Sequence, residues 1–330
     1  METARTLSLN KFKLTLFWQV AFFVTFLFLL LGAPQHVFAQ QTDFALRDYG
    51  YKTGYAYKWR DHHGQIHTTR FHLDSNMVKQ ASNEFQPYSN DEANQYVFST
   101  VKNYASQLRS RGISMTIDPS ARNDKVEIIA KGGSHSDLRR EMQAVDSLIE
   151  QSRQKYIHNK FFRLYDANSV VPDHARISKM NADRMHPVAR ALAQTAPQDR
   201  RGRVNHTLAF LQGIPYDELM NRRTSNGAGF ATPVEILTRN MGDCDSKSVA
   251  MASLLKNLLP QVPMVLVLIE GHAFVGVGGL QQGSNDFALR INNRTYILAE
   301  PAGPALMPLG QIDPRSRQQL RTGAYQHVQL

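Results

Sequence analysis

The sequence predicts an α+β protein, and three patterns along the chain support that fold class. Residues 54–73 alternate large apolar and polar side chains on both sides of a turn at His63 and Gly64, as a β-hairpin does. Residues 91–111 repeat apolar side chains every three or four positions, which is typical of an amphipathic helix. Residues 244–300 then read as one helix followed by two strand-like runs.

Length and composition exclude several protein classes. The chain has 330 residues, of which 42% are hydrophobic and 20% charged, so it is neither a disordered tail nor a multispan membrane protein. It contains 1 cysteine, which excludes both a disulfide framework and a CxxC metal or redox site. That cysteine, Cys244, therefore has to be explained by itself.

The N-terminal segment predicts export. No charged residue occurs from Leu14 to Ala33, basic residues precede this run, and Pro34 follows it. This pattern is typical of a signal peptide, here residues 1–39 with cleavage before Gln40, or of a retained membrane anchor. Because the positive charges precede the apolar run, we expect the rest of the chain to be periplasmic, or anchored in the inner membrane and facing the periplasm.

The charge balance then points to a class of partner. Lys plus Arg (38) exceeds Asp plus Glu (28), which gives a net charge of +10. Export makes nucleic acid an improbable partner, so an anionic membrane or wall surface is the expected contact for a basic face. Pairs such as Arg200/Arg201 are more often simply solvated.

We expect a boundary near residue 165, with a small α+β domain at 40–165 and a second domain at 166–330. The first domain would contain the hairpin, the helix at 91–111 and a long helix around 138–156. It would position a substrate or dock onto an envelope partner, while its aromatic stripe, Tyr55, Tyr57 and Trp59, packs into the core. The hairpin histidines do not predict a metal site, because His67 and His72 would lie on opposite faces of a strand. We expect no metal and no cofactor.

The second domain holds the candidate chemistry. A helix is predicted to begin near Cys244, with Asp243 as its N-terminal cap. A thiol at that position faces backbone N–H groups and the positive end of the helix dipole, which favour thiolate. His272 interrupts a strand-like run and Glu300 ends another, so a thiol, an imidazole and a carboxylate come from one helix and two strands. A cysteine hydrolase needs these three groups as nucleophile, base and orienting acid.

These motifs resemble the transglutaminase-like superfamily. The matching segments are GDC at Cys244, GHAFVGV at His272, YILAEP at Glu300 and the upstream FLQGIPY with Gln212, within residues 200–305. The resemblance implies a papain-like arrangement in which a cysteine-bearing helix packs on an antiparallel sheet. It assigns Cys244 as nucleophile, His272 as base, Glu300 as orienting acid and Gln212 as an oxyanion donor together with the Cys244 backbone N–H. Two features depart from the family pattern: a glutamate replaces the usual aspartate, and Asp245, Ser246 and Lys247 follow the cysteine.

The function expected from this resemblance is an exported cysteine peptidase or amidase that acts on a protein or peptide of the cell envelope. Two alternatives stay open: a protein-crosslinking transglutaminase that passes the acyl group to an amine, and a non-catalytic envelope adaptor with the same fold. Each site residue also has a purely structural interpretation, Cys244 for example as a small buried apolar group. The stretch at 225–230 lacks the GK[ST] of a phosphate loop and is expected to form a wall of the cleft.

Overall fold

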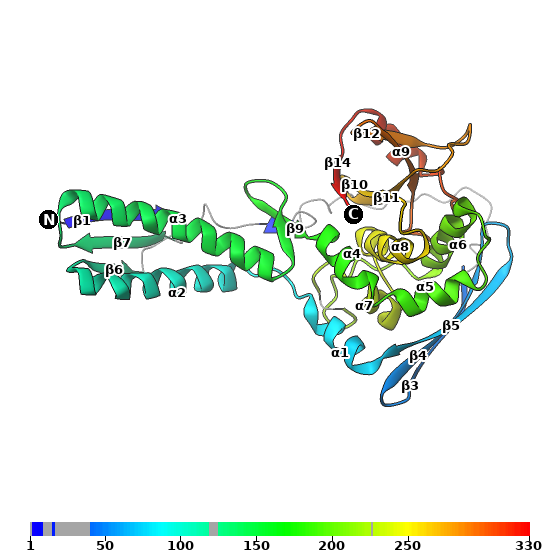
Figure 1. Cartoon of the computed structure of the whole chain (residues 1–330), viewed down its shortest axis with the longest axis horizontal. Helices are drawn as coiled ribbons and strands as arrows, with labels where there is room; N and C mark the ends of the chain where they lie inside the picture. The colour runs from blue at the N-terminus through cyan, green and yellow to red at the C-terminus, as the bar shows by residue number, and fades with distance from the viewer. Residues whose placement is uncertain (1, 9–14, 17–39, 119–124, 226) are drawn as a thin grey trace, which may run out of the picture. The chain divides into compact units, whose positions relative to one another are not determined.

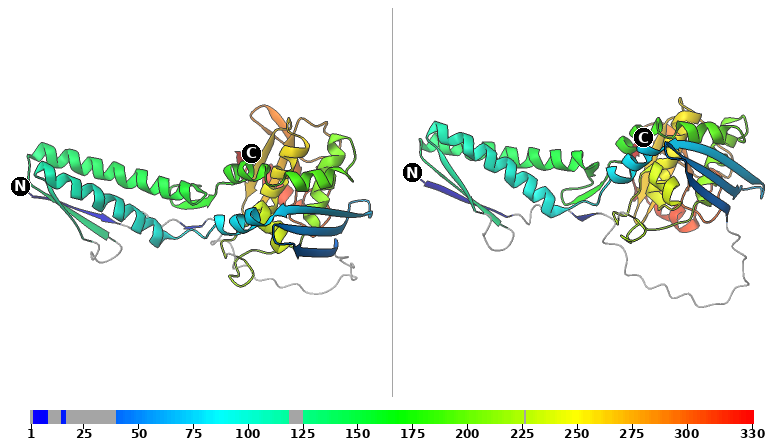
Figure 2. Two further views of the ribbon diagram at one scale, coloured as in Figure 1. Left: turned by 60° about the horizontal axis from the view of Figure 1, so that its bottom comes forward. Right: turned by 90° about the horizontal axis from the view of Figure 1, so that it is seen from below.

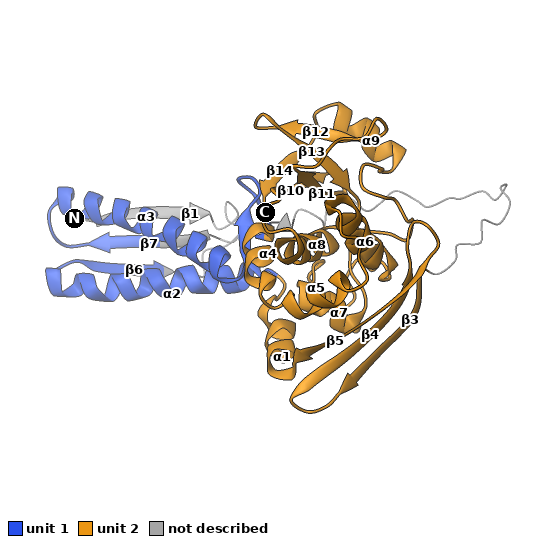
Figure 3. Cartoon of the chain, turned by 45° about the vertical axis from the view of Figure 1, so that its right-hand side comes forward, with its two compact units in different colours: residues 1–20, 88–173 blue, residues 21–87, 174–330 orange. Residues whose placement is uncertain are grey.

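The computed structural model describes residues 2–8, 15–16, 40–118, 125–225 and 227–330. It contains helices and mostly antiparallel strands in separate segments, which confirms the α+β class (Figure 1). The described chain forms two compact units (Figure 3). Unit 1 contains residues 88–173 with the described N-terminal residues 2–8 and 15–16, and unit 2 contains residues 40–87 and 174–330. Residues 88–173 of unit 1 are therefore inserted into the sequence of unit 2.

Unit 1 combines two long helices with a small sheet. The helices α2 and α3 contact each other along their lengths (Figure 2), and the sheet has the antiparallel order β1-β7-β6. A second, smaller sheet has the order β2-β9-β8. The elements are β1 Glu2–Ser8, β2 Thr15–Leu16, α2 Asn90–Leu108, a 3-10 turn Arg109–Arg111, β6 Ser114–Asp118, β7 Lys125–Lys131, α3 His135–Asn159, β8 Phe162–Leu164 and β9 Ser169–Pro172.

Local sequence explains where the two long helices begin and end. The side chain of Ser89 accepts the Glu92 N–H and begins α2, and Gly112, with φ 73°, ends the following turn. Ser134 and Asp137 form a capping box at the start of α3. The apolar faces of both helices then bury a core with Ile128 of β7, so the predicted helix at 91–111 is confirmed to within its first and last turns.

The expected export segment lies largely outside the described residues. Of Leu14–Ala33, the structure describes only Thr15–Leu16, which pair with β9. Among the helices that the structure describes, none is long and apolar enough to cross a membrane.

Unit 2 surrounds one helix, α8, with the other elements. In Figure 1, α8 lies beside strands β10 and β11, and α4, α5, α6 and α7 contact it as well. Its main sheet is antiparallel, in the order β12-β13-β11-β10-β14. The elements are β3 Gln41–Asp48, β4 Lys52–Arg60, β5 Ile66–Asp74, α1 Ser75–Glu84, α4 His174–Ala182, α5 His186–Ala193, α6 Arg200–Gly213, α7 Pro233–Arg239, α8 Cys244–Leu258, β10 Met264–Ile269, β11 His272–Gly278, β12 Ala288–Ile291, β13 Arg294–Ala299, α9 Pro314–Arg321 and β14 Gln326–Gln329.

The hairpin groups with unit 2 and not with the rest of the expected 40–165 domain. Strands β3, β4 and β5 form a three-stranded sheet whose aromatic stripe is buried. The Tyr57 hydroxyl donates to the Leu237 carbonyl at 2.7 Å, and the rings of Tyr57 and Trp59 both pack edge-on against Phe210. Aromatic burial on α6 and α7 thus draws residues 40–87 to the second half of the chain, a long-range pairing that local pattern does not show.

Candidate active site

The candidate nucleophile, Cys244, is the first residue of α8. The Asp243 side chain accepts the Ser246 N–H and caps the helix, as predicted. The thiol is buried, with 3% of the residue exposed, and the backbone N–H groups of Ala273 and Asp245 lie near the sulfur. Ala273 directly follows His272 on β11, so the sulfur lies beside the start of that strand.

His272 and Glu300 form a direct pair. Strands β11 and β13 are neighbours in the sheet, with Val275 opposite Ala299, which brings the start of β11 near the residue that follows β13. The His272 Nε2 is 2.7 Å from Glu300 Oε1, and Glu300 Oε2 accepts the backbone N–H of Asp313 at 3.0 Å. The glutamate therefore reaches the imidazole despite its extra methylene. A carboxylate acceptor at Nε2 keeps the proton on that nitrogen and leaves Nδ1 as the basic atom.

The electrostatics of the thiol differ from the sequence prediction. Burial, followed by the nearby carboxyl groups of Asp243 and Asp245, raises the pKa of Cys244 well above its ordinary value. The expectation that the helix N-terminus would favour thiolate is therefore wrong for this arrangement. Desolvation of the charged sulfur is the largest cause of the raised pKa, so the thiol has to be deprotonated by a base during attack.

Gln212 lies in the site with both of its amide donors occupied. Its Nε2 donates to the Glu300 carbonyl at 2.8 Å and to the Met307 carbonyl at 2.9 Å, and its Oε1 is 3.2 Å from His62 Nε2. An amide nitrogen carries two donors, so this geometry leaves none for an oxyanion. The structure thus gives Gln212 a different task from the one expected: it holds the backbone of Glu300 in place.

Lys247 is a buried residue to which sequence reasoning assigned no role. It lies one turn after Cys244 on α8, is fully buried, and donates to the carbonyls of Ile214 at 2.5 Å and Ala302 at 2.6 Å. Burial lowers the pKa of its ammonium group to about 7. The lysine ties α8 to the segment after Gln212 and to the loop after Glu300. In the sequence, nothing separates it from Asp245 and Lys256, the other charged residues of α8.

Tyr216 is a second residue that the sequence did not single out. It forms an isolated parallel bridge with Gly242, two positions before the nucleophile, yet 47% of the residue is exposed. Burial of its hydroxyl raises the pKa of Tyr216, and the nearby Cys244 and Asp243 raise it further. The phenol therefore lies close enough to the thiol for the two groups to interact electrostatically. An exposed aromatic ring beside a buried nucleophile is suited to contact a substrate.

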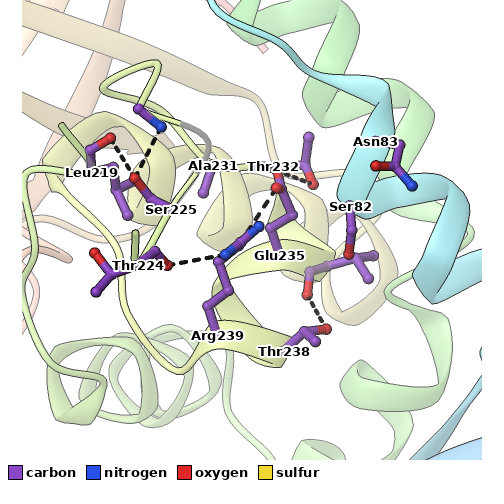
Figure 4. Close-up of polar contacts among 12 residues, drawn as sticks. Ser82, Asn83, Leu219, Thr224, Ser225, Ala231, Thr232, Glu235, Thr238 and Arg239 are labelled. Carbon is purple, nitrogen blue, oxygen red and sulfur yellow. Dashed lines mark hydrogen bonds and ion pairs between the residues drawn. The ribbon is translucent and has the colours of Figure 1, made fainter. Parts of the chain in front are cut away.

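Hydrogen bonds at residues 219–239 hold the segment that we expected to form a wall of the cleft. The Ser225 hydroxyl donates to the Leu219 carbonyl at 2.7 Å, and the Arg239 guanidinium donates to the Thr224 carbonyl at 3.0 Å (Figure 4). Thr232 and Glu235 form a capping box that begins α7. Both ends of this segment are therefore anchored.

The hairpin histidines have separate contacts. His67 bonds Asp61 at 2.7 Å, while His62 faces Gln212. Within the ranges that the structure describes, no group of three or more His, Cys, Asp or Glu side chains is arranged to hold a metal ion.

Comparison with known proteins gives no relative. No protein-family model matches the chain, and no curated protein and no solved structure matches it either. The geometry of unit 2 and the motifs around Cys244, His272 and Glu300 therefore have to indicate the function.

Proposed function

We propose that this protein is an exported cysteine hydrolase, a peptidase or amidase, that works through an acyl-enzyme on Cys244. The observation that carries the proposal is the 2.7 Å contact between His272 and Glu300 at the ends of neighbouring strands, with the Cys244 sulfur near the backbone N–H of Ala273, the residue next to His272. A thiol, an oriented imidazole and a carboxylate are the groups required for nucleophilic acyl transfer.

The reaction begins from a neutral thiol. His272 Nδ1 takes the proton from the Cys244 sulfur as the sulfur attacks the carbonyl carbon, and Glu300 stabilises the imidazolium that forms. The resulting oxyanion is stabilised by the backbone N–H of Cys244, in the first turn of α8 where N–H groups have no intrahelical acceptor. Beside this backbone N–H, Tyr216 replaces Gln212 as the side chain that we place next to the oxyanion.

The acyl-enzyme is then resolved by water. His272 passes its proton to the leaving amine, the amide C–N bond breaks, and a thioester with Cys244 remains. Water attacks the thioester with His272 again as base, which releases the carboxylic acid and restores the thiol. The substrate we propose is a protein or peptide of the cell envelope.

The location outside the cytoplasm is part of the proposal and rests on residues 1–39. The uncharged run Leu14–Ala33 follows three basic residues, and this order directs the remaining chain across the membrane. A reporter enzyme that is active only outside the cytoplasm, fused after Leu330, should be active in cells. An inactive but intact fusion would refute export.

The catalytic proposal is tested with p-nitrophenyl acetate, an activated ester that needs no knowledge of the natural substrate. The purified full-length chain should release a burst of about one equivalent of p-nitrophenol and carry an acetyl group on Cys244. Cys244→Ala should show neither. If the enzyme transfers acyl groups to amines rather than to water, an added primary amine should be converted to its acetyl amide.

The single cysteine makes the control simple. Reaction with a thiol reagent in denaturant counts the free Cys244 in each preparation, because no other thiol is present. A folded chain with a titratable thiol, no burst and no acetylation would overturn the enzymatic proposal and favour a non-catalytic adaptor.

A further inference from the structure

A second His–Asp pair lies next to the nucleophile, entirely inside unit 2. His174 Nε2 is 2.9 Å from Asp245 Oδ2, and both side chains are 0% exposed. Asp245 directly follows Cys244, while His174 is the first residue of α4, where the chain returns from unit 1 to unit 2. Helices α4 and α8 pack against each other, which holds this contact in place.

Asp245 is part of the first turn of the nucleophile helix. Its Oδ1 accepts the Ser246 N–H at 2.9 Å, and the same N–H lies 3.2 Å from Asp243 Oδ1. The carboxyl groups of Asp243 and Asp245 therefore approach the same backbone N–H. Two neighbouring buried carboxyl groups thus stand on either side of Cys244 in the sequence.

Two adjacent buried carboxyl groups cannot both be charged at low cost, so they share a proton. Burial raises the pKa of both, and that of Asp243 is raised well above its ordinary value. A donor at His174 stabilises charge on Asp245, which leaves the proton on Asp243. In this state the uncharged member is the N-cap of α8 and the charged member faces His174.

The orientation of the His174 ring is set by packing. Its ring lies edge-on to Phe230 at 5.7 Å between centroids, and Phe230 lies edge-on to Phe85 at 4.9 Å. Rings that interlock in this way restrict rotation of the imidazole. The Nε2 atom is therefore held toward Asp245.

We propose that His174 is a positioning residue for the proposed acyl transfer: by donating to Asp245 it holds the first turn of α8, and with it the Cys244 sulfur, in register with His272. This inference rests on the proposed function. Burying a hydrogen-bonded polar pair is no better for stability than burying apolar side chains of similar size, so stability alone does not account for this pair at the nucleophile.

The test compares two replacements of His174 in the full-length chain. His174→Phe keeps a ring on Phe230 but removes the donor, whereas His174→Gln keeps an N–H near the place of Nε2. Loss of a hydrogen bond to a charged group should slow acetylation of Cys244 by p-nitrophenyl acetate about tenfold or more in H174F. H174Q should recover to within about threefold of the parent, because its amide can replace the donor.

His67 supplies a matched control. His67→Phe removes another His–Asp contact of unit 2, the 2.7 Å contact with Asp61 on the hairpin, and should leave the acetylation rate unchanged. If H174F does not fold, Asp245→Asn provides the second variant, since it removes the charged acceptor at nearly constant volume and should slow acetylation in the same way.

The outcomes separate the two proposals. A parent chain without a burst overturns the proposed function and this inference together. A parent with a burst and a folded H174F or D245N that acetylates at the parent rate overturns only the positioning role. Equal slowing in H174F, H174Q and H67F would also overturn it, because a general loss of packing would then explain the effect.

Discussion

Replacing Lys247 with methionine should remove a specific pH dependence of folding. The ammonium group is fully buried and bonded to the carbonyls of Ile214 and Ala302. Its pKa falls from 10.5 to about 7 on folding, chiefly through burial. Between these two values the unfolded chain binds more protons than the folded chain, so stability rises with pH. This stability is complete above pH 10.5 and lost as pH falls through about 7.

The magnitude follows from the same two pKa values. A difference of one pKa unit corresponds to about 1.4 kcal/mol, so the full shift is worth roughly 5 kcal/mol. Between pH 7 and pH 9.5 the free energy of unfolding should rise by about 3 kcal/mol, because titration of the unfolded lysine is still incomplete at pH 9.5. Lys247→Met has no titrating group there and should lack this increase.

The measurement is urea denaturation of the full-length parent and the variant at both pH values. The difference between the two chains isolates Lys247, since the other titrating groups are common to both. Lys256→Met is the matched control on the same helix: this lysine is only partly buried and its pKa is also lowered, by burial and by Lys179, so K256M should lose a smaller part of the increase than K247M. If the free energies of unfolding of K247M and of the parent change equally with pH, the interpretation of Lys247 as a desolvated cation is wrong.

Three further predictions concern other contacts. Burial lowers the pKa of His206 to about 4, so the free energy of unfolding should fall as pH drops from about 6.5 toward 4. In urea denaturation this free energy should fall less for His206→Gln than for the parent, and an equal fall in both would contradict the prediction. Tyr57→Phe removes the 2.7 Å bond to the Leu237 carbonyl and should lower the free energy of unfolding by about 1–2 kcal/mol, whereas unchanged stability would argue against hairpin docking. Glu300→Gln should slow stopped-flow acetylation of Cys244 about a hundredfold or more; a parent-like rate would exclude an orienting role.

Local patterns predicted the elements of the site well. The cap at Asp243, the start of α8 at Cys244 and the glycine that ends the turn after α2 all follow from short-range rules, and the structure confirms them. The contact of His272 with Glu300 also agrees with the order of the strands that carry them.

Interactions across the chain could not be predicted in the same way. The engagement of the Gln212 amide with the carbonyls of Glu300 and Met307 depends on which backbone groups folding brings near it. The raised pKa of Cys244 depends on burial, which a helix position does not reveal. The place of the hairpin in unit 2 depends on rings that meet Phe210 from far away in the sequence.

The sequence by itself determined the hairpin, the long helices of unit 1, the helix that begins at Cys244, the single thiol and the residue types that flank it, because capping and periodicity act over a few positions. Only the tertiary structure decided that burial raises the pKa of the thiol, that Gln212 holds Glu300 and that His174 reaches Asp245. Desolvation and hydrogen-bond partnership are properties of the packed interior, where residues far apart in the chain become neighbours.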